Sequence, residues 1–382
     1  MRTTLEFQAD RIEAVLALHK VPARVTGGTV TPRWVSFQLL PAVGAKISKI
    51  KNLSEELAAA LDVPACRVSR HGATVAVEIP RDNPQPVRLL PLYKQLEGEI
   101  PPATAILGLA GDGAPLLIRL PSPDVAHILV SGTTGSGKTV LLQAMILSLA
   151  LANPPPARGE GLAVVLIDPK RRAFGPFEGL PHLARGVIWR REEAAEALGS
   201  LVRLMEHRGT AGDGPRVVVV IDELADLLLS EGEYRGTGTL RHNLTRLTQR
   251  GREAGIHIIA ATQKPTAAVV GPLVKANFPV RLVGRVTSVE DARTATGIGG
   301  SGAERLAGRG DFLAVAEGRV IRFQGAHVSE REIEAVVEMV RQRRAVSAAG
   351  CELRRLGTGE PVRRPTPAGR DGRFLSGGYG DV

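Results

Sequence analysis

The sequence predicts an α/β fold with a mainly parallel sheet, preceded by a small α+β domain. Hydrophobic residues make up 43% of the 382 residues, so the chain can bury a large core. After Pro123, short apolar runs alternate with helical segments, which is typical of buried parallel strands and their crossover helices. The predicted strands of this sheet cover residues 127–130, 163–167, 217–221, 256–260, 280–283 and 312–315.

Composition and proline content divide the chain into four parts. Residues 1–23 form a predicted helix, and residues 24–90 form the small α+β domain. Residues 91–341 form the large domain, whose first part, 91–123, is a proline-rich connector. Residues 342–382 are rich in Gly, Pro, Arg and Ser without periodicity, so we expect a basic, disordered tail.

Hydrophobic periodicity places several elements inside these parts. A helix over 329–344 is expected to close the fold, because Ser329 and Glu332 have the spacing of a capping box. The small domain contains a predicted strand pair, helix and alternating strand over 30–39, 48–61 and 75–79. The apolar positions of the N-terminal helix are Leu5, Ile12, Val15, Leu16 and Leu18.

Composition also excludes several classes of protein. Cys66 and Cys351 are the only cysteines, which excludes a disulfide scaffold and a zinc ribbon. The longest apolar stretch is shorter than the roughly 20 residues of a membrane span, and no signal peptide is visible, so we expect a cytoplasmic protein. The net charge of +10 favours an anionic partner such as nucleic acid. Residues 341–382 hold nine arginines and four acidic residues, so half of that charge lies in the tail.

A phosphate-binding motif follows the first predicted strand of the large domain. It matches the pattern G-x-x-x-x-G-K-[ST] and consists of Gly132, Thr133, Thr134, Gly135, Ser136, Gly137, Lys138 and Thr139. Backbone N–H groups of such a loop and the following helix N-terminus bind phosphates. Lys138 is placed to reach the β- and γ-phosphates of ATP, and the Thr139 hydroxyl is placed to bind Mg²⁺.

Polar side chains follow three other predicted strands of the same sheet. Asp222 and Glu223 come directly after the run VVVVI, where Asp222 would help to hold Mg²⁺ and Glu223 would activate the attacking water. Gln263 ends the next strand and could contact the γ-phosphate or position that water. Asp168 ends an earlier strand, where it either orients the site or caps the following turn. Because the carboxyl ends of parallel strands meet at one sheet edge, these side chains should converge on the loop.

The chain resembles the motor region of FtsK/SpoIIIE-type DNA translocases. The resemblance covers about residues 24–341 and implies a RecA-like ATPase domain. It depends on the segments HILVSGTTGSGKT, LIDPK, EGLPHL, VVVVIDELADLLL, REAGIHIIAATQKP, GPLVKANFPVRL and GDFL, which follow the family's order. The segments VSFQLLPAVGAKISKIKNLSEELAAAL and VAVEIPRDNPQPVRL are similar to the family's α-domain.

The resemblance implies a ring, a homo-hexamer, that surrounds double-stranded DNA and binds ATP between subunits. It places the arginine that completes a neighbour's site at Arg252, with Arg250 as the alternative. It places DNA-contacting residues at Lys264, Lys275 and Arg293. A motor that moves along any sequence is expected to bind phosphates by charge rather than read base edges.

From this sequence we expect neither a membrane-spanning part nor the family's winged-helix γ-domain, since only about 40 residues follow the motor region. This favours an ATP-dependent DNA translocase for plasmid, phage or chromosomal DNA transfer. The alternatives are a related ring ATPase for protein secretion and a conjugative coupling protein. A small-molecule kinase needs no α-domain or basic pore, and a non-hydrolysing ring would be expected to lose Lys138 or Glu223.

Overall fold

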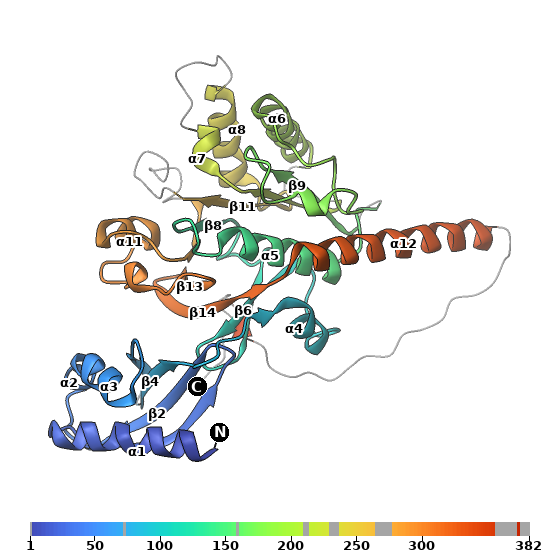
Figure 1. Ribbon diagram of the computed structural model, residues 1–382. Coiled ribbons are helices and arrows are strands. Elements are labelled where there is room, and N and C mark those ends of the chain that lie inside the picture. The colour runs from blue at the N-terminus through green and yellow to red at the C-terminus, as the bar shows by residue number, and fades with distance from the viewer. Residues whose placement is uncertain are drawn as a thin grey trace. The chain divides into compact units, whose positions relative to one another are not determined.

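The computed structural model describes residues 2–71, 74–157, 160–208, 214–228, 237–263, 277–355 and 373–374 (Figure 1). The chain forms two units, one made of residues 1–87 and 109–114 and the other of residues 88–108 and 115–382. Among the described residues, every helix is too short or too polar to cross a membrane.

The first unit packs helices against a four-stranded antiparallel sheet with the order β1-β2-β4-β3. Its amphipathic helix α1 belongs to the same core as the sheet, because Ile12 and Leu16 are fully buried with Phe37 and Leu39. Leu18 was expected to be buried but is exposed, since it ends the helix on another face. The elements are α1 (Arg2–Leu18), β1 (Ala23–Val30), β2 (Trp34–Pro41), α2 (Ile47–Asn52), α3 (Ser54–Leu61), β3 (Arg67–His71) and β4 (Thr74–Pro80).

The helix predicted over residues 48–61 is divided into α2 and α3. The division falls at Leu53, which has non-helical backbone angles (φ −91°, ψ 18°) and a buried side chain. Asn52 and Ser54 flank it, and both residue types favour helix ends over helix interiors. The apolar pattern continued through this point, which is why periodicity alone predicted one helix.

The second unit contains the predicted parallel sheet, which is confirmed. Strands β9, β10, β11, β8 and β12 are neighbours in that order and all run parallel. The antiparallel strands β13 and β14 follow β12, and β6 and β7 complete this side of the sheet with the two-residue strands β5 and β15. The bounds are β5 (Val87–Arg88), β6 (Thr104–Ala110), β7 (Pro115–Arg119), β8 (Ile128–Ser131), β9 (Leu162–Ile167), β10 (Arg216–Ile221), β11 (Ile256–Thr262), β12 (Val280–Val283), β13 (Asp311–Ala316), β14 (Arg319–His327) and β15 (Arg373–Phe374).

Helices cover both faces of the parallel strands, as the unbroken apolar runs require. Figure 1 shows α6, α7 and α8 on one side of the sheet and α5 on the other. Val217, Val219 and Ile221 of β10 pack in the core of the first side, while Val218 and Val220 are buried toward the other. The helices are α4 (Leu89–Gln95), α5 (Lys138–Ala152), α6 (Arg191–Arg208), α7 (Leu224–Leu228), α8 (Thr237–Arg250), α11 (Val289–Thr296) and α12 (Glu330–Arg355), with 3₁₀ turns at Gly175–Phe177 and Ala303–Arg305.

The C-terminal helix α12 begins where the capping box predicted. The Ser329 backbone N–H donates to Glu332 at 2.8 Å, and the Glu332 N–H donates back to the Ser329 hydroxyl at 3.4 Å. The helix continues to Arg355, beyond the predicted end at residue 344, because residues 345–355 include the helix formers Ala, Glu and Leu. The predicted disordered tail lies mostly outside the described residues. Strand β14 was not predicted, because its sequence lacks clear alternation of apolar and polar residues.

Candidate active site

The loop between β8 and α5 contains three glycines, each at a position where a side chain would be strained. Gly132, Gly135 and Gly137 have φ values of 147°, 79° and 98°, in the region that L-residues rarely adopt. A Cβ atom on Gly137 would also lie 2.7 Å from the backbone nitrogen of Gly310. Gly137 directly precedes α5, so the loop leads into a helix N-terminus, where unpaired N–H groups attract anions.

Backbone hydrogen bonds from distant segments fasten this loop. The Thr133 N–H donates to the Arg285 carbonyl at 2.8 Å. The N–H groups of Arg309 and Gly310 donate to the carbonyls of Gly135 and Ser136 at 2.9 and 2.8 Å. The loop conformation is therefore supported by the chain after β12 and by the turn before β13.

Lys138 is folded back onto the loop that precedes it. Its side-chain nitrogen donates to the carbonyls of Gly132 at 2.6 Å and Thr133 at 3.1 Å. Burial lowers the pKa of Lys138 to about 8, and the nearby carboxylates of Glu223 and Asp222 oppose this shift. The lysine therefore lies at the centre of the loop, and the carboxylates of Glu223 and Asp222 are close enough to act on its charge.

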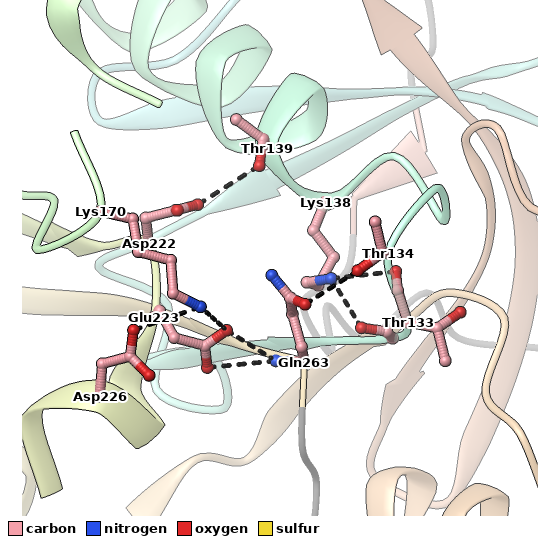
Figure 2. A network of polar contacts seen from close by, with 10 residues as sticks. Thr133, Thr134, Lys138, Thr139, Lys170, Asp222, Glu223, Asp226 and Gln263 are labelled. Atoms are coloured by element: carbon pink, nitrogen blue, oxygen red, sulfur yellow. Dashed lines mark hydrogen bonds and ion pairs between the residues drawn. The ribbon is translucent and has the colours of Figure 1, made fainter. Parts of the chain in front are cut away.

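Asp222 faces the first turn of α5 from the end of β10. The Thr139 hydroxyl donates to its Oδ1 atom at 3.4 Å, which brings the two predicted Mg²⁺ ligands together (Figure 2). Burial raises the pKa of Asp222 to about 6, with further contributions from the charges of Asp168 and Glu223. A divalent cation beside this carboxylate would reverse that shift, since it would compensate the crowded negative charge.

Glu223 is the next residue and is nearly inaccessible, with 3% of its side chain exposed. Its carboxylate accepts the Gln263 backbone N–H at 3.2 and 3.3 Å and forms an ion pair with Lys170 at 3.5 Å. Lys170 also pairs with Asp226 in α7 at 3.2 Å. Burial tends to lower the pKa of Lys170, but the hydrogen bonds to Asp226 and Glu223 outweigh it and raise the pKa.

The Gln263 side chain connects the end of β11 to the phosphate-binding loop. Its Oε1 atom accepts a hydrogen bond from the Thr134 hydroxyl at 2.9 Å (Figure 2). The structure therefore brings together the loop, Asp222, Glu223 and Gln263, all of which the sequence placed at strand ends. This convergence occurs because β8, β11 and β10 are adjacent and parallel.

Asp168 caps the turn after β9. Its Oδ2 atom accepts the backbone N–H groups of Ala173 at 2.8 Å and Phe174 at 3.2 Å. Of the two roles left open by the sequence, the hydrogen bonds show the capping role. Its charge also acts on Asp222, so the residue contributes to the electrostatics of the site.

Lys170 and Asp226 were not among the residues predicted from sequence. A signal for Lys170 was present, because it is one of only nine lysines and lies two residues after a strand that ends in Asp168. Its partner Asp226 is three residues after Glu223, which directly precedes α7, so the two acids are close along the chain. What the sequence did not contain was the adjacency of β9 and β10, which brings the lysine to these acids.

The opposite, amino-terminal edge of the parallel sheet contains Arg252. This exposed residue lies before β11, and its guanidinium donates to the Pro123 carbonyl at 3.0 Å. Since β11 separates it from Gln263 by seven strand residues, or roughly 23 Å, Arg252 is not part of this chain's own loop site. The alternative Arg250 ends α8 near the same edge and is also exposed.

Two buried histidines lie at that same amino-terminal edge. Backbone N–H of Ile258 donates to His127 Nδ1 at 3.0 Å, and His257 Nδ1 lies 3.0 Å from the Ala126 carbonyl. Burial lowers the pKa of His127 to about 3 and that of His257 to about 4. Both rings are therefore neutral and bonded to backbone rather than to charged side chains.

The predicted DNA-contacting residues are only partly described. Lys264 and Lys275 lie outside the described residues. Arg293 is exposed on α11, a helix capped at its start by a hydrogen bond from the Asp291 N–H to the Ser288 hydroxyl. It is separate from the loop site and remains a prediction for DNA binding.

Two family models match the chain. The model described as FtsK/SpoIIIE family matches residues 93–212 and 209–267, and the model described as FtsK alpha domain matches residues 1–81. The first match contains the phosphate-binding loop, the acidic pair and Gln263. The second match lies within the first unit and includes α1.

Similar proteins with curated names are DNA translocases. DNA translocase FtsK of Sporosarcina ureae is 32% identical over 368 residues, which is 88% of this chain and 46% of that protein. DNA translocase SpoIIIE of Bacillus subtilis (strain 168) is 32% identical over 364 residues, which is 87% of this chain and 45% of that protein. The chain therefore spans less than half the length of these relatives.

Two solved structures have a similar fold. The conjugation coupling protein TcpA of pCW3, solved as a monomer with ATPγS, has a TM-score of 0.61 at 19% identity, over 88% of this chain and 99% of that chain. The cytoplasmic domain of the Thermomonospora curvata type VII secretion ATPase EccC has a TM-score of 0.52 at 25% identity, over 63% of this chain and 30% of that chain. These structures show a shared fold. The family models and the sequence relatives show that the chain belongs to the FtsK/SpoIIIE family.

Proposed function

We propose that this chain is the ATP-hydrolysing motor of a double-stranded DNA translocase. The observation that carries the proposal is the convergence of a phosphate-binding loop, an acidic pair and Gln263 at one sheet edge. The names of the relatives supply the substrate, since proteins 32% identical over 88% and 87% of the chain are DNA translocases. The motor domain is proposed to cover residues 91–341 and the α-type domain residues 24–90.

The residues of the site divide the work of hydrolysis between them. The loop N–H groups and Lys138 bind and orient the phosphates of ATP. The N–H dipoles and the lysine charge take the place of the water molecules that surround the phosphates in solution. Glu223 accepts a proton from the attacking water, and Gln263 positions that water beside the γ-phosphate. The Glu223 carboxylate is suited to this role because its hydrogen bond from the Gln263 backbone fixes its direction.

The donor set at Thr139 and Asp222 fits a magnesium ion. A hydroxyl and a carboxylate are the hard oxygen ligands that Mg²⁺ prefers, and they lie within 3.4 Å of each other. Burial and the charges of Asp168 and Glu223 raise the pKa of Asp222 to about 6, and the opposing charge of Lys138 does not cancel this shift. When bound, the ion would neutralise developing charge on the phosphates. Thr139 and Asp222 would hold it and its water ligands.

Arg252 is proposed to complete the active site of a neighbouring subunit in a homo-hexamer. Two features of this chain support that role: the side chain is exposed, and it lies at the sheet edge opposite to its own loop. A guanidinium on the γ-phosphate of the neighbour would offset transition-state charge and link hydrolysis to the subunit interface. Lys264, Lys275 and Arg293 are proposed to contact DNA phosphates.

The deciding experiment measures ATP hydrolysis with and without linear duplex DNA of arbitrary sequence. We expect hydrolysis that DNA of any sequence stimulates at least tenfold. Hydrolysis at the same rate with and without DNA would favour the secretion-type alternative. No detectable hydrolysis would contradict the proposal that the chain is an ATP-hydrolysing motor. A second assay would then measure translocation directly: a protein that moves along the duplex should displace a triplex-forming oligonucleotide bound to the same DNA.

A further inference from the structure

A short turn after β9 presents Lys170 to the active site. The Arg171 N–H donates to the Asp168 carbonyl at 3.1 Å, which closes a turn with proline at its second position and Lys170 at its third. The Asp168 side chain fastens the far side of the turn through the N–H groups of Ala173 and Phe174. The backbone of Lys170 is therefore anchored to the sheet, although its side chain is 36% exposed.

The ammonium group of Lys170 lies between two carboxylates that differ strongly in exposure. It is 3.5 Å from Glu223, of which 3% is exposed, and 3.2 Å from Asp226, of which 42% is exposed. Figure 2 shows the end of the Lys170 side chain between Glu223 and Asp226 of α7, while Gln263 lies on the other side of the Glu223 carboxylate. The turn, the helix start and the strand end thus meet at one carboxylate.

We propose that Lys170 is a positioning residue that, with Asp226 as its support, directs the Glu223 carboxylate toward the attacking water. The inference rests on the proposed function, because it assigns Glu223 the role of general base. Lys170 supplies one side of the carboxylate's environment and the Gln263 backbone N–H supplies the other. A carboxylate has about four lone-pair positions, so both partners leave room for a water molecule.

A second cation explains why such a partner is needed. Lys138 lies within electrostatic reach of Glu223, and the attraction between them raises the lysine's pKa against the effect of burial. Without Lys170, the Gln263 N–H alone would oppose the attraction of the Glu223 carboxylate toward Lys138. Lys170 attracts the carboxylate from another side and so helps to hold its orientation.

The test compares Lys170→Met, Lys170→Arg and Asp226→Asn with Arg172→Met in the full chain. Arg172→Met removes one positive charge from an exposed residue of the same segment and is the matched control. The measurements are kcat and KM for DNA-stimulated ATP hydrolysis, and the affinity for the analogue AMP-PNP with Mg²⁺ by calorimetry. The parent chain, with and without DNA, tests the proposed function separately.

We expect Lys170→Met to lower kcat roughly tenfold, a fraction of the about 10²–10⁴-fold that general-base catalysis contributes. Affinity for AMP-PNP should stay within about threefold of the parent, Lys170→Arg should recover most of kcat, and Asp226→Asn should lower kcat about two- to threefold. Equal kcat in Lys170→Met and Arg172→Met would overturn the assignment even if the parent is an active motor. A parallel loss of kcat and AMP-PNP affinity would overturn it too, since it would indicate a structural role. A parent that binds AMP-PNP without hydrolysing ATP would overturn the proposed function and this inference with it.

Discussion

The two edges of the parallel sheet are built from the same buried strands but differ in chemistry. At the carboxyl edge, Lys170 and Glu223 form an ion pair, the charges of Asp222 and Glu223 act on Lys138, and strained glycines shape the loop. At the amino edge, the buried histidines are neutral and bonded to backbone, and Arg252 contacts a carbonyl. Parallel strands place all their carboxyl ends at one edge of the sheet, so the charged groups that follow the strands meet there. At the amino edge, the polar side chains named here form hydrogen bonds to backbone groups.

The largest effect is expected from removing the central charge of the carboxyl edge. Lys138→Ala should abolish detectable ATP hydrolysis, a loss of at least about 10³-fold, because it removes the positive charge that the phosphate-binding loop holds at its centre. The control is Lys94→Ala, which removes an exposed lysine from α4. Steady-state hydrolysis of both variants checks the prediction, and an active Lys138→Ala would contradict the proposed site.

Removing the base should separate binding from chemistry. Glu223→Gln should lower kcat by about 10²-fold while AMP-PNP affinity changes little, because the amide keeps the shape but accepts no proton. Glu253→Gln, an exposed acid near the amino edge, is the matched control. If both variants retain the parent's kcat, Glu223 at the carboxyl edge is not the general base, and the proposed catalytic difference between the two edges is wrong.

The amino edge should matter for hydrolysis only through a neighbouring subunit. Arg252→Ala is expected to lower hydrolysis by about 10²-fold, and Arg250→Ala much less. Mixing Arg252→Ala subunits with Lys138→Ala subunits should restore activity, since about a quarter of the interfaces in a random ring would be intact. Failure of the mixture to exceed the separate variants would assign Arg252 to its own chain or to no site.

The buried histidines should make the amino edge sensitive to acid. Their folded-state pKa values, about 3 and about 4, lie below the ordinary value, so the unfolded chain binds more protons than the folded chain between pH 6.5 and 4. The free energy of unfolding should therefore fall with decreasing pH across that window, by up to about 1.4 kcal/mol per pH unit for each histidine. Urea unfolding of His257→Asn at several pH values should show a smaller slope, compared with His19→Asn at the surface.

The smallest effect is expected from two lysines that follow Gln263 in the sequence, Lys264 and Lys275. Lys264→Ala combined with Lys275→Ala should lower the slope of log affinity against log salt for duplex DNA by roughly 0.9 per lost phosphate contact. AMP-PNP affinity should be unchanged. Lys46→Ala combined with Lys49→Ala removes the same charge from the first unit and should leave the slope as in the parent. A loss of AMP-PNP affinity in the first pair would place these lysines at the nucleotide instead.

The sequence by itself determined the parallel strands and the residues that are proposed to carry the chemistry. Long apolar runs, each followed by a polar residue, specify buried strands, and the glycines of the loop specify a backbone that other residues cannot adopt. These signals are local, which is why the positions of Lys138, Asp222, Glu223 and Gln263 could be predicted. The same locality explains the single helix predicted where α2 and α3 are separated, since the turn at Leu53 depends on core packing.

Only the tertiary structure decided which strand ends are neighbours. The spatial order β9-β10-β11-β8-β12 differs from the order along the chain, and periodicity carries no information about it. That order brings Lys170 to Glu223 and Thr134 to Gln263, across separations of 53 and 129 residues. Strand adjacency depends on how apolar faces pack across the whole domain, so the identity of the chemical groups was readable from the sequence, whereas their partners were not.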